Sequence, residues 1–188
     1  MNRRAILFSA PSGSGKTTII KQLMKHFNCF EFSISATSRK PRNGEVDGKD
    51  YYFLTPETFA QRVKNGDFLE WEEVYAQTCY GTLKSEIDRI CGMGKVMLFD
   101  VDVNGGLNIK QFLGDDLLAI FVKPPSIEVL EQRLRSRGTE SEESIQKRLG
   151  RSQKELTMAP QFDVTIVNDD LSRAVEETKQ VIEKWLNR

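Results

Sequence analysis

The chain has 188 residues, a length that suits one domain with a sizeable core and excludes a large multidomain protein. Its 39% hydrophobic and 29% charged residues are ordinary for a folded, water-soluble protein and exclude a disordered chain. The 27 basic residues balance the 27 acidic ones, so overall charge favours neither nucleic acid nor an anionic membrane as a partner.

The first residues and the cysteines bear on where the protein works. The segment MNRRAILFSA places arginines before an apolar run of about six residues, shorter than the roughly 7–15 of a signal peptide. No stretch approaches the roughly 18 apolar residues of a membrane span. The three cysteines lack C-x-x-C spacing, which fits free thiols in a reducing compartment. We therefore expect a cytoplasmic protein with no membrane partner.

Short apolar segments rich in β-forming residues recur along the chain. They predict buried strands at residues 5–9, 96–101, 117–122 and 164–167. Helical patterns follow three of these four segments within a few residues. Strands that alternate with helices favour a parallel sheet with helices on its faces. The sequence therefore predicts an α/β fold with a central parallel sheet flanked by helices.

Two zones depart from this rhythm. Residues 40–82 hold glycine turn signals, a helix that starts at Pro56 with Thr55 as its cap, and a further strand at FLEWEEVY (68–75). Residues 135–155 are dense in charge and poor in apolar side chains, so we expect a mobile, partly helical flap there and little core. No repeat or linker separates independent domains.

The stretch APSGSGKT (10–17) nearly matches the phosphate-binding loop G-x-x-x-x-G-K-[ST], with alanine in place of the first glycine. A strand precedes it and a helix follows, so backbone amides and the positive end of the helix face the same anion. Gly13 and Gly15 permit close approach of the backbone. Lys16 adds a charge for the β- and γ-phosphates, and the Thr17 hydroxyl is suited to bind Mg²⁺. The weaker alternative is a glycine-rich turn without a ligand.

Two aspartates follow the apolar strand VMLF. Asp100 ends the strand and Asp102 lies two residues on, which in a continued strand places both carboxylates on one face at its carboxyl end. Open α/β sheets bind ligands at that edge, and an aspartate there can hold the Mg²⁺ shell beside a phosphate loop. The alternative is a polar strand end that caps the next helix.

A basic segment, SRKPR, contains Arg39 and Arg42. Pro41 disfavours a helical backbone at Lys40, so the segment is extended or a turn. Paired guanidinium groups suit a phosphate dianion, which they grip through two parallel hydrogen bonds. A solvated basic loop and a nucleic-acid patch are the alternatives, and the zero net charge disfavours the second.

Taken in order, several motifs resemble the guanylate kinase family over residues 4–186. They read SAPSGSGKT, FSISATSRKPRNGEVDGKDYYF, LEWEEVYAQTCYGT, LFDVDVNGG and RGTESEESIQKRL. The loop without its first glycine is typical of that family. The block S-R-x-P-R-x-G-E-x-x-G-x-D-Y is the most specific, because it fixes nine positions over fourteen residues.

The resemblance implies a P-loop NTPase fold in a single domain of residues 1–188. It further implies an inserted GMP-binding subdomain at about 35–82, a small helical lid at about 135–155, and a core made of about 1–34, 83–134 and 156–188. The implied reaction is ATP + GMP → ADP + GDP with Mg²⁺, a step of guanine nucleotide synthesis and salvage. ATP and GMP are the expected partners, nucleic acid is not, and no oligomeric state is predicted.

The resemblance also implies roles for individual residues. The implied catalytic residues are Lys16, Arg39, Arg133, Arg137 and Arg148. The implied ATP-binding residues are Ser12, Gly13, Ser14, Gly15, Lys16, Thr17, Thr18 and Asn168. The GMP phosphate is assigned to Arg39, Arg42, Tyr51 and Tyr80, and the guanine to Ser35, Glu70, Thr82 and Asp102. The Mg²⁺ ligands are Thr17 and, through water, Asp100.

Two functions of other kinds stay open. One is a non-catalytic guanylate kinase-like interaction module, which would have lost loop and lid residues that this chain keeps. The other is a nucleoside monophosphate kinase with a different base specificity. A GTPase is disfavoured because the chain has no N-K-x-D motif.

Overall fold

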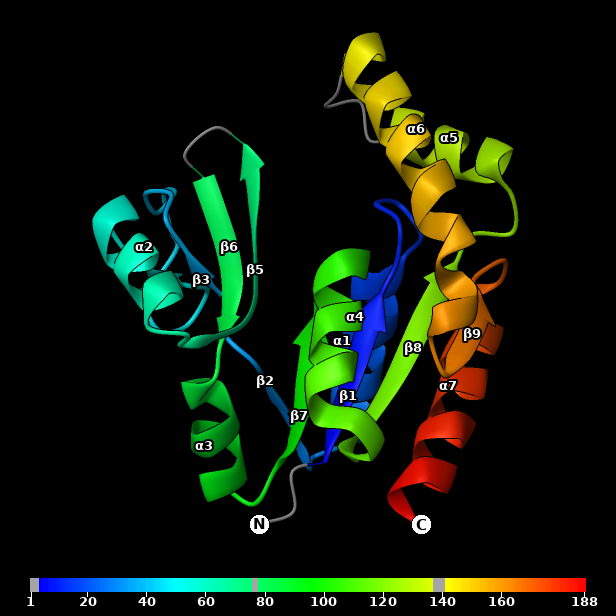
Figure 1. Cartoon of the computed structure of the whole chain (residues 1–188). Helices are drawn as coiled ribbons and strands as arrows, with labels where there is room; N and C mark the ends of the chain where they lie inside the picture. The colour runs from blue at the N-terminus through cyan, green and yellow to red at the C-terminus, as the bar shows by residue number, and fades with distance from the viewer. Residues whose placement is uncertain (1–3, 76–77, 137–140) are drawn as a thin grey trace.

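The computed structural model describes residues 4–75, 78–136 and 141–188. Its central sheet has five parallel strands in the order β2-β7-β1-β8-β9 (Figure 1). Their bounds are Ala5–Ser9 (β1), Phe30–Phe32 (β2), Val96–Asp100 (β7), Leu117–Lys123 (β8) and Val164–Val167 (β9). The predicted parallel sheet is confirmed with its four strands, and β2 is an edge strand that the sequence patterns did not indicate.

Helices cover both faces of this sheet. Along β1, Ile6 and Phe8 face one hydrophobic cluster, whereas Ala5 and Leu7 face another, as the alternation of a strand requires. The first cluster includes residues of α1 (Lys16–His26) and α7 (Leu171–Leu186). The second includes residues of α3 (Ser85–Gly92) and α4 (Val103–Leu113). The sheet is therefore buried on both sides, which explains its continuous apolar strands.

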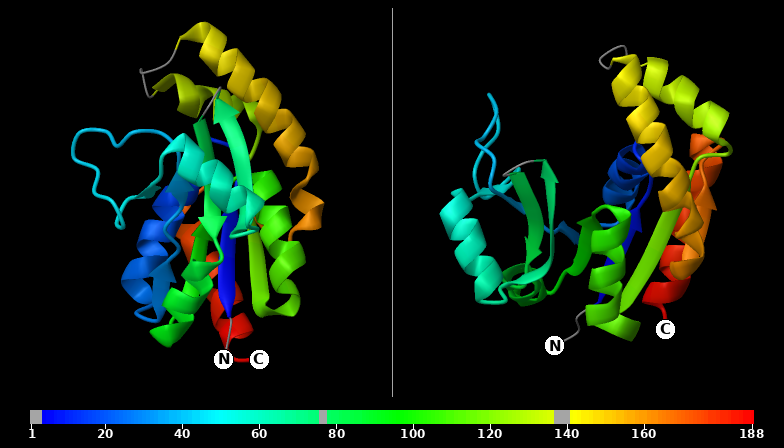
Figure 2. Two further views of the ribbon diagram at one scale, coloured as in Figure 1. Left: turned by 60° about the vertical axis from the view of Figure 1, so that its left-hand side comes forward. Right: turned by 45° about the horizontal axis from the view of Figure 1, so that its top comes forward.

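A second sheet of four strands, in the order β4-β3-β6-β5, stands beside the first (Figure 2). Its strands are Ala36–Thr37 (β3), Tyr52–Phe53 (β4), Phe68–Tyr75 (β5) and Thr78–Leu83 (β6). Helix α2 (Pro56–Lys64) begins as predicted, with the Thr55 hydroxyl accepting a hydrogen bond from the Thr58 amide at 3.2 Å. Phe59 of α2 stacks on Phe68 within a separate small core.

Glu86 joins the two sheets. Its side chain is buried, and its carboxylate accepts hydrogen bonds from the Ile34 amide at 2.7 Å and the Tyr52 hydroxyl at 2.8 Å. Arg89 neutralises it with bonds of 2.8 Å from Nε and Nη2. Because Tyr52 belongs to the second sheet and Arg89 to α3, this cluster fixes where the second sheet attaches to the core.

Helices α5 (Ile127–Ser136) and α6 (Glu142–Thr157) pack on each other beyond the carboxyl edge of the central sheet (Figure 1). The charged zone, expected to bury little, contributes Ile145 and Leu149 to a small cluster with Leu130 and Leu134. Two 3₁₀ turns, Gly114–Asp116 and Ala159–Gln161, complete the fold. In the part of the chain that the structure describes, no helix combines the length and apolar character needed to cross a bilayer.

Candidate active site

The loop after β1 has the backbone of a phosphate cradle. Gly13 and Gly15 adopt φ angles of 96° and 89°, a region that side chains disfavour, and α1 starts at the next residue, Lys16. A Cβ atom at Gly15 would also lie 2.2 Å from Nδ2 of Asn168. Space and backbone conformation thus both require glycine at position 15, and the amides at the start of α1 are open to an anion.

Asn168, expected on the adenine side, lies directly behind this loop. It is buried after the end of β9, and its Nδ2 donates a hydrogen bond of 2.7 Å to the carbonyl oxygen of Ser14. The carbonyl oxygen of Asn168 accepts a bond of 2.9 Å from Nη2 of Arg133. Asn168 therefore supports the loop backbone and links it to α5, a role that the sequence did not indicate.

Lys16 and Asp100 form an ion pair at the mouth of the loop. The Lys16 ammonium also donates a hydrogen bond of 3.1 Å to the carbonyl oxygen of Val101. Strand β7 ends at Asp100, whereas Asp102 caps α4 by accepting a bond of 2.8 Å from the Gly105 amide. The helix-capping alternative therefore applies to Asp102, which lies beyond the end of the strand and does not continue its alternation of faces. Both carboxylates nevertheless line one pocket.

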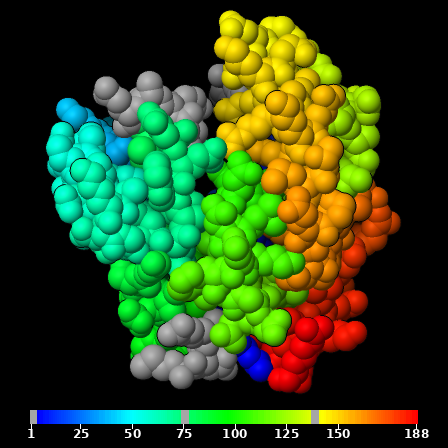
Figure 3. All heavy atoms as spheres, viewed as in Figure 1, coloured from blue at the N-terminus to red at the C-terminus, as the bar shows by residue number. Residues whose placement is uncertain are grey.

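That pocket has a volume of about 800 Å³ and opens between the phosphate loop, the end of β7 and α6. Residues 12–18, expected to bind ATP, all line it. Arg148 reaches in from α6, and its Nη1 donates a bond of 2.9 Å to the Ser12 hydroxyl. Arg137 lies outside the described residues. Residues of α6 line one side of the pocket. In the space-filling view the surface is indented between α6 and the β5–β6 arm (Figure 3).

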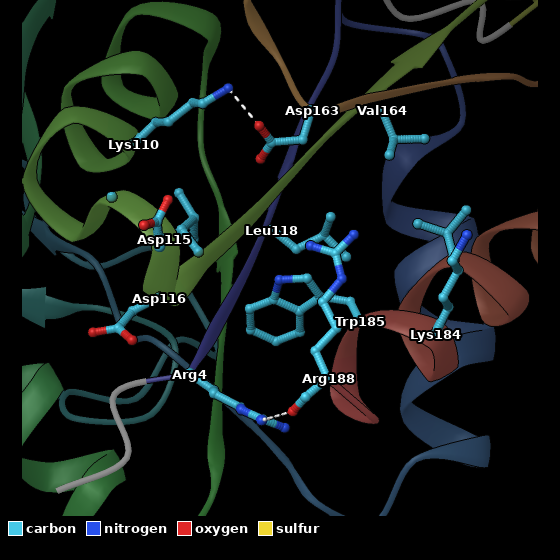
Figure 4. A pocket seen from close by; sticks show the side chains of 13 residues that line it. Arg4, Lys110, Asp115, Asp116, Leu118, Asp163, Val164, Lys184, Trp185 and Arg188 are labelled. Atoms are coloured by element: carbon cyan, nitrogen blue, oxygen red, sulfur yellow. Dashed lines mark hydrogen bonds and ion pairs between the residues drawn. The ribbon is translucent and has the colours of Figure 1, made fainter.

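A second pocket of about 770 Å³ lies at the opposite end of the central-sheet strands (Figure 4). Three of its charged side chains already have partners, since Lys110 pairs with Asp163 at 2.6 Å and Arg4 donates to the carbonyl oxygen of Arg188 at 2.9 Å. Here β8 and β9 begin. Because parallel sheets bind ligands at the carboxyl ends of their strands, the pocket at the phosphate loop is the candidate active site.

The basic segment folds back on the second sheet. The Arg39 guanidinium donates to both carboxylate oxygens of Glu45 at 2.6 and 2.7 Å, and its Nε donates to the Tyr80 hydroxyl at 3.1 Å. It also lies over the ring of Tyr51, 5.0 Å from the ring centroid. The hydrogen bonds from Arg39 lower the pKa of Glu45 to about 2.

Arg39, Tyr51 and Tyr80, three of the four residues expected to hold a phosphate, therefore converge on one spot. The two N–H groups with which the Arg39 guanidinium binds the Glu45 carboxylate are equally suited to bind a phosphate. The side chain of Arg42 is exposed, and its backbone amide donates to Glu45 at 2.7 Å. Glu45 was not among the expected site residues, although it lies in the same specific motif.

A buried carboxylate, that of Glu70, lies further along the second sheet. Glu70 of β5 and Thr82 of β6 are cross-strand partners, and the Thr82 hydroxyl donates a hydrogen bond of 2.6 Å to Oε1 of Glu70. Burial raises the pKa of Glu70 above its usual value. The other oxygen packs against α4, where a Cβ atom at Gly105 would lie 2.8 Å from it. Ser35 lies at the edge of this sheet, where its carbonyl oxygen accepts a bond of 2.9 Å from the Tyr52 amide.

Glu72 and Asp102 add two further carboxylates to this region, and both face Arg151 of α6. A hydrogen bond with Asp102 raises the pKa of Glu72 to about 7. Burial opposes ionisation of Asp102, but bonds from Glu72 and the Gly105 amide lower its pKa. Arg151 of α6 approaches both, with its Nη2 3.6 Å from Asp102 and 3.8 Å from Glu72. Glu72 was not among the expected site residues, although the two-residue alternation from Glu70 places it on the same face of β5.

Comparisons with known proteins identify the family to which the chain is related. The guanylate kinase family model matches residues 2–185. The guanylate kinase of Bacteroides thetaiotaomicron is 52% identical over 188 residues, covering 100% of this chain and 92% of the relative. That of Porphyromonas gingivalis is 49% identical over 97% of this chain and 98% of its own length.

A solved structure agrees with these sequence matches. The crystal structure of guanylate kinase from Anaplasma phagocytophilum superposes with a TM-score of 0.74 at 26% identity, covering 96% of this chain and 85% of that one. This likeness confirms the expected P-loop NTPase architecture. By family model, relatives and fold, the chain belongs to the guanylate kinase family.

Proposed function

We propose that this protein transfers the γ-phosphoryl group of ATP to GMP, giving ADP and GDP. The observation that carries the proposal is the pairing of two complementary sites in one chain. One is a glycine-rich loop with Lys16 at the start of α1. The other is formed by the second sheet and the segment after β3, where Arg39 bonds to Tyr80 and Thr82 bonds to the carboxylate of Glu70. The first suits a nucleoside triphosphate, and the second suits a phosphate dianion attached to a base with hydrogen-bond donors.

In the proposed reaction the protein positions the substrates and stabilises charge. Phosphoryl transfer has a loose, in-line transition state in which charge develops on the transferred oxygens, and it needs little covalent chemistry. Lys16 would leave its pair with Asp100 to hold the β- and γ-phosphates, and Arg148 would approach from α6. Arg133, Arg137 and Arg148 are proposed as the further cationic groups around the transferred phosphoryl. The acceptor phosphate is already ionised, so no general base is required.

The acceptor side would exchange one anion for another. Arg39 holds Glu45 through two parallel hydrogen bonds, and a GMP phosphate would take the place of that carboxylate, assisted by Arg42, Tyr51 and Tyr80. The guanine would lie against Ser35, Glu70, Thr82 and Asp102. Because Glu70 is buried and hydrogen-bonded to Thr82, it presents a fixed acceptor to the guanine N1–H and N2–H₂.

Kinases of this family need a divalent metal, and we propose Mg²⁺ with Thr17 and, through water, Asp100 on its protein side. Both residues line the pocket, and a hydroxyl with a carboxylate is the oxygen donor set that Mg²⁺ prefers. Among residues 4–75, 78–136 and 141–188 no cluster of three or more His, Cys, Asp or Glu could hold a metal alone. This suits an ion held jointly with substrate phosphates, where it would neutralise charge on the β- and γ-oxygens.

The remaining assignments follow from this reaction. We propose the second sheet with α2, about residues 35–82, as the GMP-binding subdomain, and about 135–155 as a lid that excludes water during transfer. The free thiols of Cys29, Cys79 and Cys91 suit a reducing compartment, and we place the enzyme in the cytoplasm, in guanine nucleotide synthesis and salvage.

A non-catalytic interaction module is disfavoured, because the loop, Lys16, Arg39 and Arg148 are all present and in contact with site residues. The deciding experiment is a coupled assay of ADP formation with ATP, Mg²⁺ and each of GMP, AMP, CMP and UMP. We expect GMP to be the strongly preferred acceptor. ADP formation that is the same with and without GMP, or a preference for another monophosphate, would refute the proposal.

A further inference from the structure

Three parts of the molecule meet at Arg151. The residue belongs to α6, Glu72 to strand β5 of the second sheet, and Asp102 to the junction of β7 and α4 in the core. Nε of Arg151 donates a hydrogen bond of 2.7 Å to Glu155 on its own helix, which leaves Nη2 directed toward the other two carboxylates. One guanidinium thus connects the helical lid, the second sheet and the core.

The carboxylates that face Arg151 need a cation. Oε2 of Glu72 and Oδ2 of Asp102 both lie within 4 Å of the same nitrogen of Arg151, so the two carboxylates repel each other when both are ionised with no positive charge nearby. One oxygen of Asp102 is occupied by the Gly105 amide. Oε2 of Glu72 is buried, and no donor within the described part of the chain makes a hydrogen bond to it. Arg151 is the lid residue whose charge reaches both.

We propose that Arg151 is a positioning residue for GMP recognition: it neutralises Glu72 and Asp102 and so holds Asp102 in place for the guanine. The inference rests on the proposed function, in which Asp102 contacts the base. Arg151 itself does not touch the reacting atoms. It acts through Asp102, and because it belongs to α6, the strength of guanine binding depends on where the lid helix lies.

The distances fit such a coupling. Nη2 of Arg151 lies 3.6 Å from Oδ2 of Asp102 and 3.8 Å from Oε2 of Glu72, within ion-pair range but longer than hydrogen bonds. An approach of α6 by about 1 Å converts both into charged hydrogen bonds of about 2.8 Å. A withdrawal of α6 leaves two repelling carboxylates behind the guanine. Lid approach therefore strengthens the acceptor site, and an occupied acceptor site favours lid approach.

The test uses Arg151→Met, which keeps the apolar stem, together with Glu72→Gln and the double variant. For Arg151→Met we expect KM for GMP to rise about fivefold, at the upper end for a partly exposed ion pair, while KM for ATP changes less than about twofold. Adding Glu72→Gln removes the repulsion, so the double variant should recover KM for GMP to within about twofold of wild type. Arg151→Lys should retain part of the effect.

The matched control is Lys154→Met, which removes the same charge from an exposed position three residues along the same helix and should leave both KM values unchanged. Thermal melting checks that each variant folds, and Arg151→Gln replaces the methionine variant if that one does not. The proposal is overturned if Arg151→Met lowers KM for GMP or leaves it unchanged, if it raises both KM values equally, or if the two substitutions act independently. A wild-type enzyme inactive with GMP would instead refute the proposed function, before any variant is compared.

Discussion

The Thr82 hydroxyl donates a hydrogen bond of 2.6 Å to Oε1 of Glu70, across the β5–β6 pair. The other carboxylate oxygen packs against Gly105 at the start of α4. Glu70 is thereby fixed from two sides, and each of its oxygens keeps lone pairs for a ligand. Guanine offers N1–H and N2–H₂ as neighbouring donors to such a carboxylate, whereas adenine has an unprotonated N1 and no amino group at C2.

We predict that Glu70→Gln lowers kcat/KM for GMP by roughly 10²-fold or more, on the order of 3 kcal/mol for a lost charged hydrogen-bond pair. Glutamine keeps the shape but replaces one acceptor by a donor. AMP turnover should fall less, so that the ratio of GMP to AMP narrows. Steady-state kinetics with both acceptors measures this, with Glu73→Gln on the same strand as the control. An equal fall for both acceptors would make Glu70 structural.

The pH dependence of kcat/KM for GMP should reflect the ionisation of the Glu70 carboxylate. Burial raises the pKa of Glu70, and only the ionised form accepts both guanine donors. As pH falls through that raised pKa, the carboxylate takes up a proton and kcat/KM for GMP declines, beginning nearer neutrality than the ordinary value of about 4.3 allows. Profiles measured from about pH 8 to about pH 5 should show this acid limb in wild type and lose it in Glu70→Gln. An acid limb that persists in the variant would assign it to another group.

Lys16→Ala should abolish transfer while the protein stays folded. The ammonium acts where charge develops, so the loss should fall on kcat and amount to roughly two or more orders of magnitude. Lys21→Ala, an exposed lysine of the same helix, is the control. A folded Lys16→Ala variant with turnover near that of wild type would mean that the loop is not the donor site.

Gly105→Ala tests the close approach behind Glu70. Alanine favours a helix over glycine by roughly 1 kcal/mol, but here its Cβ atom would lie 2.8 Å from the Glu70 carboxylate and would displace it. We expect KM for GMP to rise about tenfold, a loss of roughly 1.4 kcal/mol, with KM for ATP little changed.

Gly150→Ala is the matched helical control, because nothing lies within 4 Å of the added carbon. It should leave KM for GMP unchanged and slightly raise the melting temperature. If Gly105→Ala and Gly150→Ala both bind GMP as wild type does, the contact between α4 and Glu70 has no part in recognition.

The sequence by itself determined the parts of this protein that depend on local order. The apolar strands of the central sheet, the phosphate loop and the capped helix α2 follow from neighbouring residues, since alternation, glycine freedom and a capping hydroxyl act within a few positions. The family motifs, which are also contiguous segments, led to the same kinase fold that the comparisons confirm.

Other features were decided only when distant segments came together. Helix α4 carries Gly105 and Gly106, which have poor helix propensity, yet Asp102 caps the helix, and the close approach of Glu70 and Leu7 leaves little room for a side chain at either glycine. Edge strand β2 exists through its pairing with β7, and β6 through its pairing with β5.

The same holds for single side chains of the candidate site. Asn168 supports a loop 154 positions away in the chain, and Arg151 faces Glu72 from another part of the fold. Neither contact can be predicted from the neighbouring residues, because an ion pair or hydrogen bond between separate elements depends on where the backbone places those elements. Local sequence thus specified the strands and the loop, while the arrangement of the sheets and lid helix decided which charges meet.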